Sequence, residues 1–235
     1  FHGGGWGVNF LDIFDTSLHS LANQTGCVII AVNYQKAPEH PYPTPFNDCY
    51  ATLLWVYNNA SKLEIDQRKI GVGGDSAGAN LAAAVALKAR DSAGPVLAYQ
   101  LLLYPCNERN FETDSYRTFA TGYGLARQSM QWFWEQYLQG SDHDNDPYAC
   151  PSRAKDFSNL APAIIITAQF DPLKDDGVKY ERLLREAGVQ TYYHDYAGMI
   201  HGFLVMGAVT PTAAIAIADC ATLIKEITRT RDGGA

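Results

Sequence analysis

The sequence predicts an α/β protein with a mostly parallel, twisted sheet and helices on both of its faces. Along the chain, short apolar runs alternate with stretches whose apolar residues recur at helical spacing, which is the pattern of strands joined by crossover helices. The 235 residues are 47% hydrophobic and 18% charged, a balance typical of a folded protein and not of a disordered chain. We therefore predict one domain over residues 1–235 with a sizeable apolar core.

Before residue 69 the pattern predicts two helices and one strand. Apolar residues at positions 11, 14, 18 and 21 have helical spacing, and the continuous apolar run 27–32 indicates a buried strand. Prolines at positions 38, 41, 43 and 45 exclude regular structure from the next loop, because the ring fixes φ and removes the N–H donor. An apolar stripe over 46–57 then predicts a helix packed on one face.

After residue 69 the alternation becomes clearer. We expect strands at four apolar runs: 69–73, 97–104, 163–168 and 191–196. Three further helices are expected between them: a buried, alanine-rich one over 80–89, one over 129–138 and one over 178–187. Thr210 and Pro211 supply a cap and a first-turn proline for a last helix that ends near residue 228.

Composition also limits the partners. The formal net charge of −7 argues against nucleic acid and anionic membrane surfaces, because an acidic chain repels phosphate groups. No apolar run reaches the roughly 18 residues of a membrane span. The five cysteines are spread along the chain without a C-x-x-C pair, so we expect isolated thiols, a reducing compartment and a cytoplasmic location. The oligomeric state stays open, with a homodimer among the alternatives.

The N-terminus is unusual. The chain begins with Phe1 rather than Met, and a glycine-rich loop of catalytic type starts at the second residue. A loop of this type should follow a strand, so we expect the chain to be a fragment whose natural start lies upstream. Any signal peptide would lie upstream as well.

The strongest local signal is a G-x-S-x-G pentapeptide, residues 74–78, between a predicted strand and a predicted helix. A nucleophilic serine on such a turn sits in a strained backbone, and side chains two positions away on either side would collide with it. The turn lifts the hydroxyl of Ser76 above the sheet, and the helix that follows directs N–H groups at developing negative charge. The alternative is a glycine-rich turn with an incidental serine, which the strand–turn–helix context disfavours.

A second signal is the run of three glycines, Gly3, Gly4 and Gly5, between His2 and Trp6. Without side chains, the backbone can approach a ligand closely and turn its N–H groups inward. With the N–H of Ala77, these groups can form an oxyanion hole, in which one lost donor costs about 2.7–4 kcal/mol of transition-state stabilisation. The alternative is a flexible linker, which would not need the flanking aromatic rings.

Ser76 needs a base, and six histidines are available. His201 follows the last predicted strand in a loop, where a base can reach a serine at the same sheet edge. His194 lies inside that strand and should pack. Other positions suit the surface, namely His19, His40 and His143, whereas His2 is too close to the glycine loop to act as a base and should fix that loop by hydrogen bonds.

The base needs an acid that fixes its tautomer and stabilises the imidazolium. Asp171 follows the strand that ends near residue 168, so it should lie at the same edge. Asp175 and Asp176 fall where the next helix begins and suit first-turn capping better. Asp75 adjoins the serine and should point away from the histidine. The order serine, aspartate, histidine is the one expected for a serine hydrolase of this topology.

These separated signals resemble one family, the hormone-sensitive-lipase-like (bacterial family IV) branch of α/β-hydrolase esterases. The spacings agree as well: 171 − 76 = 95 residues from serine to aspartate, and 201 − 171 = 30 from aspartate to histidine. The motifs that carry the resemblance are residues 2–6 (HGGGW), 34–43 (YQKAPEHPYP), 73–78 (GGDSAG), 171–177 (DPLKDDG) and 201–203 (HGF).

The resemblance implies the α/β-hydrolase fold, the triad Ser76, Asp171 and His201, an oxyanion hole from the glycine loop and Ala77, and no cofactor. It implies hydrolysis of short- to medium-chain carboxylic esters, so the expected partner is a small-molecule ester. Family members usually carry an N-terminal cap and the first strands of the sheet before the glycine motif, and we expect both to be missing from this chain. Residues 142–146 lack the glycine and the closing glutamate of a calcium loop, so no metal is predicted.

Two alternatives remain. The same triad cleaves activated amides, so an amidase or arylacetamide-deacetylase-like activity is the alternative among enzymes. A non-catalytic small-molecule receptor on the same fold is the alternative from another class, although such receptors have lost the catalytic histidine and His201 is present here. If neutral His201 is the base, activity should fall as the pH drops below its pKa, for which the ordinary value is about 6.5.

Overall fold

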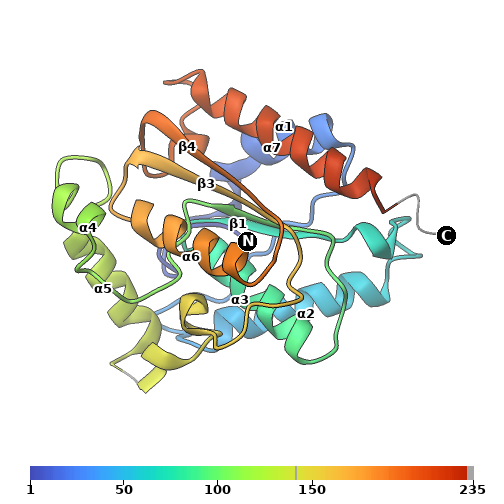
Figure 1. Ribbon diagram of the computed structural model, residues 1–235, viewed down its shortest axis with the longest axis horizontal. Helices are drawn as coiled ribbons and strands as arrows, with labels where there is room; N and C mark the ends of the chain where they lie inside the picture. The colour runs from blue at the N-terminus through green and yellow to red at the C-terminus, as the bar shows by residue number, and fades with distance from the viewer. Residues whose placement is uncertain (141, 232–235) are drawn as a thin grey trace.

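A computed structural model describes residues 1–140 and 142–231 of the chain. Four strands form one sheet in the order β1-β2-β3-β4, and every neighbouring pair is parallel (Figure 1). The strands are β1 (Val72–Asp75), β2 (Gln100–Leu103), β3 (Ala163–Phe170) and β4 (Thr191–Ile200). The predicted parallel sheet is therefore confirmed.

Seven α-helices and five short 3-10 helices surround the sheet within the described ranges. The α-helices are α1 (Asp15–Thr25), α2 (Thr44–Asn58), α3 (Ala77–Asp91), α4 (Asp114–Thr118), α5 (Arg127–Leu138), α6 (Lys174–Glu186) and α7 (Thr212–Arg229). The 3-10 helices are η1 (Leu11–Phe14), η2 (Gln67–Lys69), η3 (Asp142–Asn145), η4 (Pro151–Arg153) and η5 (Phe203–Val205). All predicted helices are present, whereas α4 was not expected.

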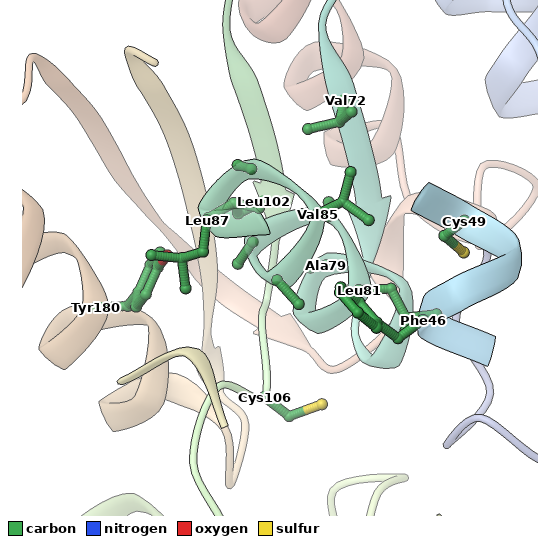
Figure 2. Packing of buried hydrophobic residues seen from close by; sticks show 14 of the residues in the cluster. Phe46, Cys49, Val72, Ala79, Leu81, Val85, Leu87, Leu102, Cys106 and Tyr180 are labelled. Carbon is green, nitrogen blue, oxygen red and sulfur yellow. The ribbon is translucent and has the colours of Figure 1, made fainter. Parts of the chain in front are cut away.

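The sheet has an apolar core on each face because successive side chains of a strand point to opposite sides. Leu102 and Ile165 belong to the core that contains α2, α3 and α6. Figure 2 shows Phe46 of α2, Leu87 of α3 and Tyr180 of α6 in this core. The helices predicted on both faces are thus confirmed.

Helix α3 is buried along almost its whole length and packs on the sheet. Seven alanines from residue 77 to residue 89 occupy buried positions, and the helix contacts both β1 and β2. Small side chains let the helix axis approach the strands, so the N-terminus of α3 is held in a fixed position above the sheet edge. On the opposite face, α7 packs against α1 and over the odd-numbered side chains of β2, such as Leu101.

The strand predicted over 27–32 is wrong. These residues join none of the ladders formed by the described residues, and the side chains of Val28 and Ile30 are 63% and 36% exposed. An apolar cavity separates them from β1, since residues 28–32 and 71–74 line the same hollow. An apolar run predicts burial, but a strand also needs a neighbour at hydrogen-bonding distance, and this segment lacks one here.

The other strand boundaries differ only at their ends. Strand β1 starts three residues later than expected, because Gln67–Lys69 forms a 3-10 turn, capped by the Asp66 carboxylate, which accepts a hydrogen bond from the N–H of Arg68. Strands β3 and β4 run further than predicted, to Phe170 and Ile200, and carry the chain directly to the next functional residues. Within the described residues, no helix combines the length and hydrophobicity that crossing a bilayer requires.

Candidate active site

Three polar residues follow three parallel strands at the same edge of the sheet. Ser76 follows β1, Asp171 follows β3, and His201 follows β4. Because the strands are parallel, their carboxyl ends meet at one edge, which is where α/β proteins bind ligands. The fold therefore brings together three residues that are up to 125 positions apart in the sequence.

These three side chains form a continuous hydrogen-bond chain. The Nε2 atom of His201 lies 2.9 Å from the Oγ of Ser76, and its Nδ1 lies 2.7 Å from the Oδ2 of Asp171. The second carboxylate oxygen of Asp171 accepts a hydrogen bond from the N–H of Leu173 at 2.8 Å, which fixes the plane of the carboxylate. Asp171 is fully buried and Ser76 is 7% exposed, so the chain is shielded from bulk water. An aspartate at Nδ1 leaves Nε2 free to take a proton from the serine.

The backbone at Ser76 adopts a conformation that few residues tolerate. Its φ is 54° and its ψ −120°, at the junction where β1 ends and α3 begins. A Cβ atom added to Gly74 would lie 2.3 Å from the backbone of Gly78, and one added to Gly78 would lie 2.2 Å from the carbonyl oxygen of Phe1. Both glycines are therefore required by close backbone contact, as the G-x-S-x-G spacing predicts.

The glycine loop passes directly against this turn. Gly4 and Gly5 have φ values of 114° and 57°, which favour glycine. No hydrogen bond within the described part of the chain engages the N–H groups of Gly4, Gly5 or Ala77. Three backbone donors are thus free beside the serine, as an oxyanion hole requires.

Gly3 differs from the sequence-based prediction. Its N–H donates to the Oδ1 of Asp75 at 2.6 Å, so this donor is already bound and cannot also serve an oxyanion. The prediction of Gly3 as an oxyanion-hole donor is therefore wrong. The reason is tertiary: Asp75 projects toward the glycine loop and binds the first of its N–H groups.

The sequence did not indicate the contact between Asp75 and the glycine loop. Desolvation raises the pKa of Asp75 to about 6, although the hydrogen bond from Gly3 acts in the opposite direction. The sequence showed only that Asp75 adjoins the serine and should point away from the histidine. Nothing in its neighbourhood along the chain indicates Gly3, 72 positions away, as its partner.

The remaining histidines lie away from the reactive serine. His2 is buried, and its Nδ1–H donates to the carbonyl oxygen of Gly3 at 2.8 Å, which agrees with the prediction that it fixes the glycine loop. Burial lowers the pKa of His2 to about 4, so its ring is neutral at pH 7. His19 and His40 are exposed as expected, whereas His194 is exposed on β4 rather than packed. Position 194 is exposed because β4 is an edge strand.

The rival aspartates occupy the first turn of α6, as predicted. Asp175 accepts a hydrogen bond from the N–H of Ser115 at 2.8 Å. Asp176 is buried, and this burial raises its pKa well above the ordinary value. Neither is hydrogen-bonded to His201.

Two aromatic rings that the sequence did not single out line the site. The ring of Tyr104, at the end of β2, lies edge-on to the imidazole of His201 with a centroid distance of 4.8 Å. The ring of Phe133 on α5 covers Gly5, since a Cβ added there would lie 2.2 Å from it. No group of three metal-ligating side chains occurs among the described residues.

Comparisons with known proteins agree with this geometry. A family model described as an alpha/beta hydrolase fold matches residues 1–205. Carboxylesterase NlhH of Mycobacterium tuberculosis is 40% identical over 217 residues, covering 91% of this chain and 68% of that protein. An ethyl acetate hydrolase of Pseudomonas putida is 36% identical over 215 residues, covering 90% of this chain and 67% of that protein. The crystal structure of a thermostable esterase from Pseudomonas putida has a TM-score of 0.93 and 37% identity, covering 96% of this chain and 72% of that one.

Proposed function

The chain belongs to the hormone-sensitive-lipase-like branch of the alpha/beta hydrolase fold family, and from that premise we propose that this carboxylesterase cleaves short- to medium-chain esters through Ser76, His201 and Asp171. The observation that carries the proposal is the unbroken hydrogen-bond chain from Ser76 through His201 to Asp171, with distances of 2.9 and 2.7 Å. The free backbone N–H groups of the glycine loop and Ala77 would stabilise the oxyanion that forms during attack.

In the proposed mechanism, His201 takes the proton of Ser76 as the serine oxygen attacks the ester carbonyl carbon. The carbonyl oxygen becomes an oxyanion and binds the N–H groups of Gly4, Gly5 and Ala77. The protonated imidazole, stabilised by Asp171, gives its proton to the departing alcohol, and an acyl-enzyme forms on Ser76. Water then attacks the acyl carbon with His201 as base, which releases the carboxylic acid and restores the serine.

The proposed substrate class rests on the relatives. One of them is named for the hydrolysis of ethyl acetate, an ester with a two-carbon acyl group. We expect kcat/KM to be highest for acetyl to hexanoyl esters and to fall for longer chains. A series of p-nitrophenyl esters, compared with a p-nitroanilide of the best acyl group, measures this preference. Faster cleavage of the anilide than of the ester would favour the amidase alternative.

Replacement of the nucleophile tests the proposed function. The Ser76→Ala protein should lose about 10⁵-fold or more in kcat, since a serine hydrolase without its nucleophile retains only binding and oxyanion stabilisation. Ser129→Ala, at an exposed position of α5, is the matched control and should remain within twofold of the wild type. A Ser76→Ala protein that retained a tenth of the wild-type rate would exclude Ser76 from the mechanism.

A further inference from the structure

The segment over residues 34–43 carries a conspicuous motif but has no part in the mechanism above. It lies against the glycine loop at two points. The hydroxyl of Tyr34 donates to the carbonyl oxygen of His2 at 2.7 Å, and the N–H of Ala37 donates to the carbonyl oxygen of Trp6 at 3.0 Å. These two carbonyls lie on either side of the three glycines, so the segment holds both ends of the loop.

We propose that Tyr34 is a positioning residue for this reaction, which aims the N–H groups of the glycine loop at the substrate oxyanion. The inference rests on the proposed function, because an oxyanion forms only if the protein hydrolyses esters through Ser76. It assigns to Tyr34 an effect on transition-state binding without contact between Tyr34 and the substrate.

The argument starts from the planarity of the peptide bond. In a trans peptide unit the C=O and the following N–H point in opposite directions, so a hydrogen bond to the carbonyl also fixes the direction of the N–H. Glycines have no side chains to anchor the loop, and their backbone has more conformations to lose than that of any other residue. The direction of their N–H groups must therefore be set by bonds to the carbonyls.

Each of the three consecutive peptide units is held at its carbonyl. In the first unit, Tyr34 binds the carbonyl of His2 and Asp75 binds the N–H of Gly3, at 2.7 and 2.6 Å. In the second unit, the carbonyl of Gly3 accepts from the Nδ1–H of His2 at 2.8 Å and from the Nδ2–H of Asn9 at 3.3 Å. These bonds direct the N–H of Gly4 to the opposite side, where no described group binds it.

The third unit is held by the loop itself. The carbonyl oxygen of Gly4 accepts hydrogen bonds from the N–H groups of Gly7 at 3.1 Å and Val8 at 2.9 Å. These bonds direct the N–H of Gly5 to the opposite side, and it too stays free. In the first unit, both the carbonyl and the N–H are therefore hydrogen-bonded. The second and third units each present one free N–H, that of Gly4 and that of Gly5.

Tyr34 acts on the first two units at once. Its hydroxyl binds the carbonyl of His2, and its ring stacks on the imidazole of His2 at a centroid distance of 4.3 Å and an interplanar angle of 9°. That imidazole holds the carbonyl of Gly3, so the stacking fixes the second unit through His2. Tyr34 is only 1% exposed, and burial raises its pKa well above the ordinary value, so the hydroxyl remains a donor at every pH at which an esterase is assayed.

The test compares two tyrosines that each donate one hydrogen bond. Tyr34→Phe removes the hydroxyl and keeps the stacked ring. Tyr148→Phe is the matched control, because its hydroxyl donates to Asp91 at 2.9 Å and its ring stacks on Phe46, away from the glycine loop. The readouts are kcat and KM for a p-nitrophenyl ester, and the inhibition constant of an alkyl trifluoromethyl ketone, which forms a tetrahedral adduct with the serine.

We expect Tyr34→Phe to lower kcat about fivefold to twentyfold with KM within twofold, because a misaimed donor loses part of the stabilisation that a missing donor loses entirely. The inhibition constant should rise by the same factor as kcat/KM falls, since both report binding of a tetrahedral oxyanion. Tyr148→Phe should leave all three constants within twofold.

A second variant keeps the test decisive if Tyr34→Phe folds poorly. His2→Phe keeps a ring stacked on Tyr34 and removes the shorter of the two hydrogen bonds to the carbonyl of Gly3, which leaves only the 3.3 Å bond from Asn9. It should therefore show the same paired loss. The inference is overturned if either folded variant keeps kcat and the inhibition constant within twofold of the wild type. It is also overturned if kcat falls while the inhibition constant does not change. Either outcome leaves the proposed function intact, because that depends on the separate loss of activity in Ser76→Ala.

Discussion

The two loops that meet at the active site are held in different ways. The turn at Ser76 is held by its own chain: β1 enters it, α3 leaves it, and the N–H of Ser76 donates to the carbonyl of Leu103 in the neighbouring strand at 2.8 Å. The glycine loop belongs to no helix or strand and is held by polar groups from distant parts of the chain, Asp75 and Tyr34 among them. The first loop is specified by local sequence, whereas the second depends on tertiary contacts.

The comparison has a consequence for mutagenesis. Replacing a residue of the Ser76–His201–Asp171 chain should remove nearly all of kcat. Replacing a residue that holds the glycine loop should lower kcat only in part, because each replacement removes one of several contacts that hold the loop.

After Ser76→Ala, the largest effect is expected from the acid of the hydrogen-bond chain. Asp171→Asn should lower kcat about 10⁴-fold with little change in fold, because the amide favours the wrong tautomer of His201. Asp114→Asn, whose carboxylate is 94% exposed, is the matched control and should stay within twofold. Steady-state kinetics on a p-nitrophenyl ester measures both. If Asp171→Asn kept more than a tenth of the wild-type kcat, the residues of the hydrogen-bond chain would not each be essential.

An intermediate effect is expected where the two loops touch. In Gly78→Ala the new methyl group would lie 2.2 Å from the carbonyl oxygen of Phe1 and 2.7 Å from that of His2, so the glycine loop must move away from the serine. Since the loop carries two of the three free donors, we expect kcat to fall about hundredfold or more.

Gly207→Ala provides the control for this replacement, because no atom of residues 1–140 or 142–231 lies within 4 Å of a Cβ at that position. Its kcat should equal that of the wild type. A Gly78→Ala protein of normal activity would mean that the position of the glycine loop does not matter to the reaction, and would break the comparison between the two regions.

The smallest effect is expected at Asp75, and it should depend on pH. The folded-state pKa of about 6 lies above the ordinary value of 3.8, so the folded protein binds the proton more tightly than the unfolded chain. The contribution of Asp75 to stability is therefore fully present below pH 4 and is lost as the pH rises through 6. Asp75→Asn removes this dependence and keeps an oxygen that can accept from Gly3.

Urea unfolding at pH 4 and pH 7 measures this difference. At each pH, the free energy of unfolding of the wild type is subtracted from that of Asp75→Asn. This difference should increase by up to about 3 kcal/mol from pH 4 to pH 7. At pH 7 we also expect kcat to fall by a few-fold, because a neutral acceptor binds the Gly3 N–H less strongly than a carboxylate. If the two free energies changed in parallel, folding would not raise the pKa of the Asp75 carboxyl group.

The same contrast explains which parts of the molecule the sequence could predict. Local sequence predicts the strand–turn–helix around Ser76, because short apolar runs mark the strands and a side chain at Gly74 or Gly78 would clash. The same apolar runs place Asp171 and His201 directly after strands. The strand ends were missed by a few residues because a turn such as Gln67–Lys69 competes for the same positions.

The larger errors involve partners that are distant in the sequence. Residues 27–32 have a strand-like composition but pair with no strand of the described chain, and strand pairing cannot be predicted from one segment alone. Gly3 looked like its two neighbours in the loop, and only the contact with Asp75 distinguishes it. The contacts of Tyr34 and Phe133 with the glycine loop likewise join residues more than thirty positions apart, which periodicity and motif spacing do not indicate.

Covalent labelling tests the central claim most directly, because it reports on the nucleophile itself and not on turnover. The wild-type protein is treated with a fluorophosphonate probe, digested and analysed by mass spectrometry, and the labelling rate is compared with that of His201→Ala. We predict one adduct, on the peptide that contains Ser76, and a rate at least about hundredfold lower without the imidazole. An adduct on a different residue, or equal labelling rates for the two proteins, would contradict a serine activated by His201, and an unlabelled wild type would favour the receptor alternative.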